Sequence, residues 1–128
     1  MSEKVTEVTK DILPDQDLDC VVYGCTSGTI AAGHASIEKK VQAAKPNADV
    51  TTPSTAAITA LKKMNINKIC LFTPYSKKLN DEVLEYFKSE GFDITSNAYF
   101  DIESDLDIGK VDQNYLYEVL SNIDLNNA

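Results

Sequence analysis

The sequence contains no arginine, and this absence narrows the chemistry that is available to it. Its 12 basic residues are all lysines, against 20 aspartates and glutamates, which gives a net charge of −8 at pH 7. Without guanidinium groups there is no bidentate clamp for an anion, so an anion site must use backbone N–H groups, hydroxyls or lysines. An acidic chain also lacks the basic surface that nucleic acid requires, and we exclude nucleic acid as a partner.

Long apolar runs and cysteines are scarce as well. No run approaches the ~20 apolar residues that cross a bilayer, so we expect no membrane association. The cysteines Cys20, Cys25 and Cys70 are too few, and odd in number, for a disulfide framework, and no signal peptide is recognisable at the start. These features predict a cytoplasmic protein with free thiols.

The scarcity of histidine and cysteine also bears on cofactors. Cys20 and Cys70 lie within apolar strands, where we expect them to pack in the core. The single histidine, His34, and Cys25 do not complete a zinc ligand set. We therefore expect no metal site, and we expect no other cofactor either.

Apolar runs alternate with helical patterns along the chain, and this alternation predicts βα units with parallel strands. The expected helices cover residues 5–13, 30–45, 53–64, 76–90 and 112–120. The expected strands cover residues 18–23, 49–51, 68–73 and 92–100. The predicted fold class is α/β, with a three-layer, doubly wound, mainly parallel sheet.

The order of the elements is unusual for such a sheet. A doubly wound sheet usually starts with a strand near its centre, whereas this chain starts with a helix and ends where a further strand is due. We expect residues 1–128 to form a single α/β domain that is truncated at both ends. Exposed strand edges would then make a homo-oligomer possible.

Three strand-to-helix junctions, residues 24–29, 52–55 and 73–76, are rich in hydroxyls and contain no charged residue. Parallel strands bring such junctions to one rim of the sheet, where ligands bind. Uncharged donors at helix N-termini would suit a small carboxylate. Serine, threonine and proline are also common where helices begin, so a purely structural explanation stays open.

Cys25 stands in the first junction, at a predicted helix start, where the surroundings favour a reactive thiolate. Tyr75 ends the third strand, where its phenol would donate a hydrogen bond to a carboxylate or protonate a carbanion. The structural alternatives are a small buried cysteine and a tyrosine at the rim of the sheet.

A family resemblance rests on several short motifs. They are Val22–Thr29 (VYGCTSGT), Gly33, Thr51–Ser54 (TTPS), Leu71–Tyr75 (LFTPY) and Gly91–Phe92. In this order they resemble the maleate cis-trans isomerase and arylmalonate decarboxylase group of the aspartate/glutamate racemase superfamily, over roughly residues 18–120. The resemblance implies two similar α/β domains with the active site between them. This chain would be most of the first domain, without the family's opening strand and without the second domain.

The resemblance also implies roles for four residues. Cys25 matches the catalytic cysteine of the first domain, Thr26 and Ser27 match the loop that holds a substrate carboxylate, and Tyr75 matches a carboxylate-binding tyrosine. The implied function is that of a maleate isomerase-like domain, in which a cysteine nucleophile acts on a small dicarboxylate. Glycine is typical of the decarboxylases at the position of Cys25, so cysteine favours an isomerase or racemase.

Other functions stay open. They are an aspartate/glutamate-type racemase, an arylmalonate decarboxylase-like enzyme and a non-catalytic carboxylate-binding domain. Because the family's active site lies between two domains, we expect the 128-residue chain alone to be inactive.

Overall fold

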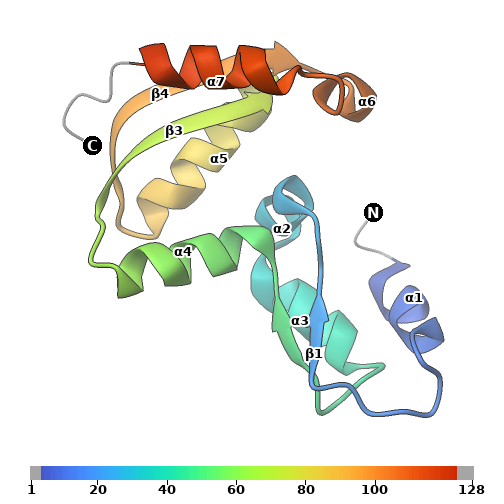
Figure 1. Cartoon of the computed structure of the whole chain (residues 1–128). Helices are drawn as coiled ribbons and strands as arrows, with labels where there is room; N and C mark the ends of the chain where they lie inside the picture. The colour runs from blue at the N-terminus through green and yellow to red at the C-terminus, as the bar shows by residue number, and fades with distance from the viewer. Residues whose placement is uncertain (1–3, 124–128) are drawn as a thin grey trace. The chain divides into compact units, whose positions relative to one another are not determined.

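The computed structural model describes residues 4–123, and the chain divides into two compact units, residues 1–63 and residues 64–128. The first unit consists of α1 (Val5–Asp11), β1 (Cys20–Val22), α2 (Thr26–Ala32), α3 (His34–Gln42), β2 (Asp49–Thr51) and α4 (Pro53–Lys63). The second consists of β3 (Lys68–Tyr75), α5 (Lys77–Ser89), β4 (Asp93–Ile102), α6 (Asp105–Ile108) and α7 (Gln113–Asn122). Each unit therefore contains two strands joined through helix, as Figure 1 shows.

The strands pair in parallel, which confirms the predicted α/β class. β1 pairs with β2 in the register Val21↔Val50, and β3 pairs with β4 from Lys68↔Asp93 to Tyr75↔Ile102. Within residues 4–123, however, each strand has one neighbour, so two two-stranded sheets form in place of a continuous one.

The core of the first unit lies where α1 and α3 pack beside β1. It contains the buried side chains Val5, Val21, Ile37, Val41 and Ala48. Successive residues of a strand point to opposite faces, so Val22 lies away from this core and is 66% exposed. Cys20 shares that face and is exposed, and Cys70 is only partly buried. The expectation of core packing is therefore wrong for Cys20, and for Cys70 it holds only in part.

The helix expected over residues 30–45 is two helices. α2 begins earlier, at Thr26, and α3 follows after Gly33, whose φ of 78° lies in the left-handed region. Glycine adopts this conformation at little cost because it has no Cβ. The break ends α2 after seven residues and lets α3 turn its buried residues, Ile37 and Val41, toward the core.

Aromatic side chains organise the second unit. Phe72 of β3 meets Phe100 of β4 with ring centroids 4.9 Å apart, and Phe100 stacks on Tyr115 of α7 at 5.8 Å. α5 contributes Val83 and Phe87 to the buried residues. α6, a single turn, was not expected from the sequence. In the part of the chain that the structure describes, no helix is long and apolar enough to cross a membrane.

Candidate active site

A tight turn at the end of β1 brings Tyr23 and Cys25 together. The Tyr23 N–H donates to the Thr51 carbonyl of the neighbouring chain segment at 2.9 Å, and the Cys25 N–H donates to the Tyr23 carbonyl at 2.9 Å. A hydrogen bond between residues i and i+2 closes a three-residue turn. The hydrogen bond to Thr51 thus holds the backbone of Tyr23 in place, and the turn holds the backbone of Cys25 beside it.

Cys25 is the N-cap of α2, so it stands at a helix start as expected, although the helix begins four residues earlier than the predicted range. Its sulfur accepts a hydrogen bond from the Gly28 N–H at 3.2 Å. Its carbonyl accepts from the Thr29 N–H at 3.1 Å and from the Thr29 hydroxyl at 2.6 Å. Serine, threonine, aspartate and asparagine usually fill this capping position with an oxygen. Here a sulfur fills the position and already faces a backbone donor, and such a donor binds an ionised acceptor most strongly.

Gly28 leaves room for the sulfur and for a phenol. A Cβ at this position would lie 2.6 Å from Tyr23 Oη and 2.8 Å from Cys25 Sγ. Both distances are shorter than a carbon atom tolerates, so a side chain at residue 28 would displace one or both groups. The Ser27 hydroxyl lies 3.8 Å from the same sulfur. The thiol therefore sits among a phenol, a backbone N–H and a hydroxyl.

The Tyr23 hydroxyl is shielded from solvent and has no hydrogen-bond partner of good geometry among residues 4–123. Burial raises the pKa of Tyr23 above its ordinary 10.0, and the Cys25 sulfur raises it further through its charge and as a hydrogen-bond acceptor. A phenol with a raised pKa keeps its proton and acts as a donor. Sequence reasoning missed both Tyr23 and Gly28, although a glycine three residues after Cys25 was a usable signal.

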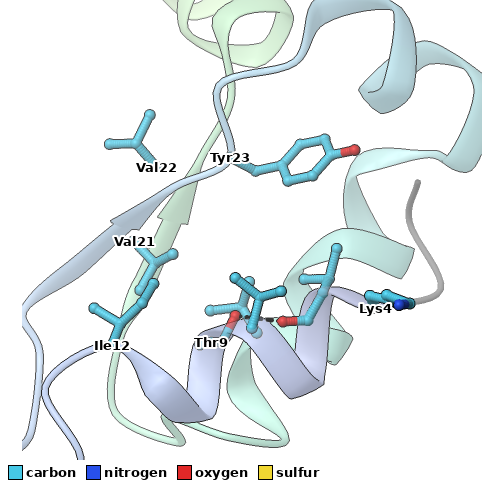
Figure 2. A pocket seen from close by; sticks show the side chains of 9 residues that line it. Lys4, Thr9, Ile12, Val21, Val22 and Tyr23 are labelled. Atoms are coloured by element: carbon cyan, nitrogen blue, oxygen red, sulfur yellow. Dashed lines mark hydrogen bonds between the residues drawn. The ribbon is translucent and has the colours of Figure 1, made fainter.

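Tyr23 also borders an apolar cavity of about 190 Å³ beside α1. Figure 2 shows the Tyr23 and Val22 side chains on opposite sides of the chain at the end of β1. The side chains that line the cavity with Tyr23 include Val8, Ile12 and Val21. The tyrosine ring thus borders the apolar cavity, while its hydroxyl interacts with the Cys25 sulfur.

In the other two hydroxyl-rich junctions, the threonine hydroxyls have partners within their own unit. Thr52 is buried, with 1% of its surface exposed, and its hydroxyl lies 2.8 Å from the Thr55 hydroxyl. The Thr55 hydroxyl also accepts a hydrogen bond from the Thr52 N–H at 3.1 Å. In the second unit the buried Thr73 hydroxyl donates to Asn80 Oδ1 at 2.9 Å. For Thr52, Thr55 and Thr73 the structural explanation accounts for the residue type.

The structure therefore brings together three of the four predicted site residues. Thr26 and Ser27 follow Cys25 as the first two residues of α2, and all three are half-buried. Tyr75 is the last residue of β3 in the second unit and is also half-buried. Its expected place beside Cys25 stays a prediction. Within residues 4–123 no group of three or more His, Cys, Asp or Glu side chains suits a metal ion.

Comparison with known proteins places these residues in a family. Residues 3–126 match the family described as arylmalonate decarboxylase. The chain belongs to this family. It is 28% identical to the maleate isomerase of Geobacillus stearothermophilus, over 91% of this chain and 49% of that protein. It is 29% identical to the maleate isomerase of Pseudomonas putida, over 88% of this chain and 48% of that protein. The chain thus spans about half the length of these relatives.

Solved structures of the family share the fold. The Nocardia farcinica maleate cis-trans isomerase, determined as a mutant with a covalently bound succinylcysteine intermediate, superposes with a TM-score of 0.87 at 19% identity. The match covers 100% of this chain and 55% of that one. Unliganded arylmalonate decarboxylase superposes with a TM-score of 0.71 at 20% identity, over 94% of this chain and 51% of that one. The resemblance stated from the motifs and the predicted fold class are both confirmed.

Proposed function

We propose that this chain is the cysteine-bearing domain of a cofactor-independent maleate cis-trans isomerase, with Cys25 as the nucleophile. The observation that carries the proposal is the environment of the Cys25 sulfur. This sulfur accepts a hydrogen bond from the Gly28 N–H at 3.2 Å and lies near the hydroxyls of Ser27 and Tyr23. It is supported by the names of the relatives, since the chain is 28% and 29% identical to two maleate isomerases.

The chemistry needs only a thiolate and donors for two carboxylates. The Cys25 thiolate adds to one alkene carbon of maleate, and the π electron pair moves to the other carbon, where the adjacent carboxylate delocalises it. The former double bond is then single and rotates. Expulsion of the thiolate restores the double bond in fumarate, so no proton or electron is consumed. A covalent intermediate replaces one forbidden rotation by separate easier steps, and donors at the carboxylates stabilise the transient charge.

Thr26, Ser27 and Tyr75 are the residues that we propose bind the dicarboxylate. Thr26 and Ser27 adjoin the nucleophile at the start of α2, and hydroxyl donors are what a chain without arginine has to offer a carboxylate. We further propose that a second domain of the same protein completes the site and that the protein is cytoplasmic. A homo-oligomer would follow if the strand edges of two copies pair.

Racemase or arylmalonate decarboxylase-like activity is the alternative within this family. It is favoured by the match of residues 3–126 to arylmalonate decarboxylase. A non-catalytic carboxylate-binding domain is the alternative outside enzymes. Trapping of the covalent adduct separates these alternatives from the isomerase, because neither needs a carbon–sulfur bond to the substrate.

The test is to incubate the 128-residue chain with maleate and to locate adducts by mass spectrometry while proton NMR follows fumarate. We expect a succinyl adduct on Cys25 that is absent in Cys25→Ser and retained in Cys20→Ser, because Cys20 is exposed on the far face of β1. We expect sustained turnover only from a longer protein that also contains the proposed second domain. An adduct distributed equally over Cys20 and Cys25 would contradict the proposed nucleophile. Turnover by the short chain, abolished in Cys25→Ser, would instead contradict its expected inactivity.

A further inference from the structure

The Tyr23 hydroxyl is a buried polar group that the proposed reaction does not use. Its oxygen is shielded from solvent, and within the described residues it has no hydrogen-bond partner of good geometry. A buried hydroxyl without a partner costs about 1–3 kcal/mol of desolvation. Such a group therefore requires an explanation beyond packing, since phenylalanine would fill the same space without the cost.

The position of Gly28 shows what the hydroxyl faces. The place that a Cβ of residue 28 would occupy lies 2.6 Å from Tyr23 Oη and 2.8 Å from Cys25 Sγ. The oxygen and the sulfur are therefore no farther apart than the sum of these two distances. The turn between Tyr23 and Cys25, closed by the 2.9 Å hydrogen bond from the Cys25 N–H to the Tyr23 carbonyl, fixes this proximity through the backbone.

We propose that Tyr23 is a positioning residue that donates a hydrogen bond to the ionised sulfur of Cys25 and holds it over Gly28. The inference rests on the proposed role of Cys25 as nucleophile. A neutral thiol is only a weak hydrogen-bond acceptor. An ionised sulfur attracts the phenol proton more strongly, so the hydroxyl acquires its partner when the nucleophile forms.

The raised pKa of Tyr23 agrees with this assignment. Burial and the neighbouring sulfur both keep the phenol protonated, so it serves as a donor and not as a base. The Gly28 N–H approaches the same sulfur from α2. Two donors from different directions would fix the sulfur in one orientation, which an attack on a planar alkene requires.

The test compares Tyr23→Phe with Tyr117→Phe, each in a Cys20→Ser background, by the rate of Cys25 alkylation with iodoacetamide as a function of pH. Tyr117 is 75% exposed, so its variant controls for the loss of one phenol. We expect Tyr23→Phe to slow alkylation roughly tenfold at neutral pH, because the ionised sulfur loses a hydrogen-bond donor. The limiting rate at high pH should be unchanged, which a purely structural role would not predict. Equal pH profiles for the two variants would overturn the proposal.

A reciprocal measurement decides the matter if Tyr23→Phe does not fold. By linkage, removal of the sulfur should lower the pKa of the Tyr23 phenol. Ultraviolet titration of the tyrosines in Cys25→Ser should therefore show one phenol that ionises at lower pH than in the unaltered chain. An unchanged titration would overturn the proposal. Both readouts are independent of turnover, so an inactive chain with the expected shifts would disprove the proposed function and leave the Tyr23 contact standing.

Discussion

The two units build the same strand–helix–strand arrangement but treat the junction after the first strand differently. In the first unit the strand has three residues, and the next helix begins on a sulfur that accepts from its first turn. In the second unit the strand has eight residues, and Ser76 precedes α5 without a capping hydrogen bond from its side chain. A short strand followed by a capped, tightly turned junction fixes the position of Cys25, the proposed nucleophile, whereas Tyr75 is the last residue of a long strand.

The units also differ in how a buried polar group is used. In the second unit the Thr73 hydroxyl and Asn80 form a neutral pair at 2.9 Å. In the first unit the ammonium of Lys45, only 5% exposed, donates to the carbonyls of Leu13 at 2.8 Å and Gln16 at 2.6 Å. A charged donor makes the stronger hydrogen bond. We therefore expect the stability of the first unit to depend more on Lys45 than that of the second unit depends on Thr73.

Replacement of Lys45 by methionine should produce the largest loss of stability. The loop that Lys45 holds contains Leu13 and Asp15, whose φ angles of 42° and 61° are unfavourable for residues with a Cβ. Loss of two charge-assisted hydrogen bonds should lower the free energy of unfolding by about 2 kcal/mol, measured by urea denaturation. Thr73→Val, the counterpart in the second unit, should cost about 1 kcal/mol. A larger loss in Thr73→Val than in Lys45→Met would reverse the comparison between the units.

Gly28→Ala should separate reactivity from stability within the first unit. The new Cβ would displace Tyr23 Oη and Cys25 Sγ, which lie 2.6 and 2.8 Å from its position. We expect alkylation of Cys25 at neutral pH to slow about tenfold. The free energy of unfolding should change by less than about 1 kcal/mol, because alanine favours helix and the displaced groups are side-chain ends.

Gly24→Ala is the matched control for this substitution. Gly24 belongs to the same junction, but a Cβ there would meet nothing within 4 Å. Its alkylation rate should equal that of the unaltered chain. If Gly28→Ala reacted as fast as Gly24→Ala, the arrangement of phenol, sulfur and glycine would have no effect on the reactivity of Cys25.

Much of the fold was predictable from the sequence because its signals are local. The apolar runs of Lys68–Tyr75 and Asp93–Ile102 and the prolines and glycines between elements locate the strands and helices within a few residues. The break at Gly33 was missed because glycine inside a helical pattern also fits an uninterrupted helix. The exposure of Cys20 was missed because an apolar run does not reveal which face of a strand is covered.

The candidate site was predictable only in part. Cys25 was singled out by its place at a helix start and Tyr75 by its place at the end of a strand, whereas the roles of Thr26 and Ser27 came from the resemblance to a family. Tyr23 was missed because its role depends on a turn that folds the chain back over two residues, and no pattern of polarity marks such a turn. Thr52 and Thr55 look as suitable as Thr26 in the sequence, but their hydroxyls contact each other.

The pH dependence of stability should give the smallest effect and also tests the site. The pKa of Tyr23 is raised in the folded chain above 10.0, first by burial and then by the Cys25 sulfur. As the pH rises through 10.0, the unfolded chain releases this proton while the folded chain keeps it. The folded state therefore loses stability with rising pH, at no more than about 1.4 kcal/mol per pH unit, until the folded phenol also ionises. Tyr23→Phe removes this loss, so its free energy of unfolding should fall less steeply with pH than that of Tyr117→Phe. Urea denaturation would measure both variants from roughly one pH unit below to one above the ordinary tyrosine pKa of 10.0. Parallel curves for the two variants would mean that Tyr23 ionises as readily in the folded chain as in the unfolded one. The Tyr23 phenol of the first unit would then ionise as readily as an exposed tyrosine of the second unit.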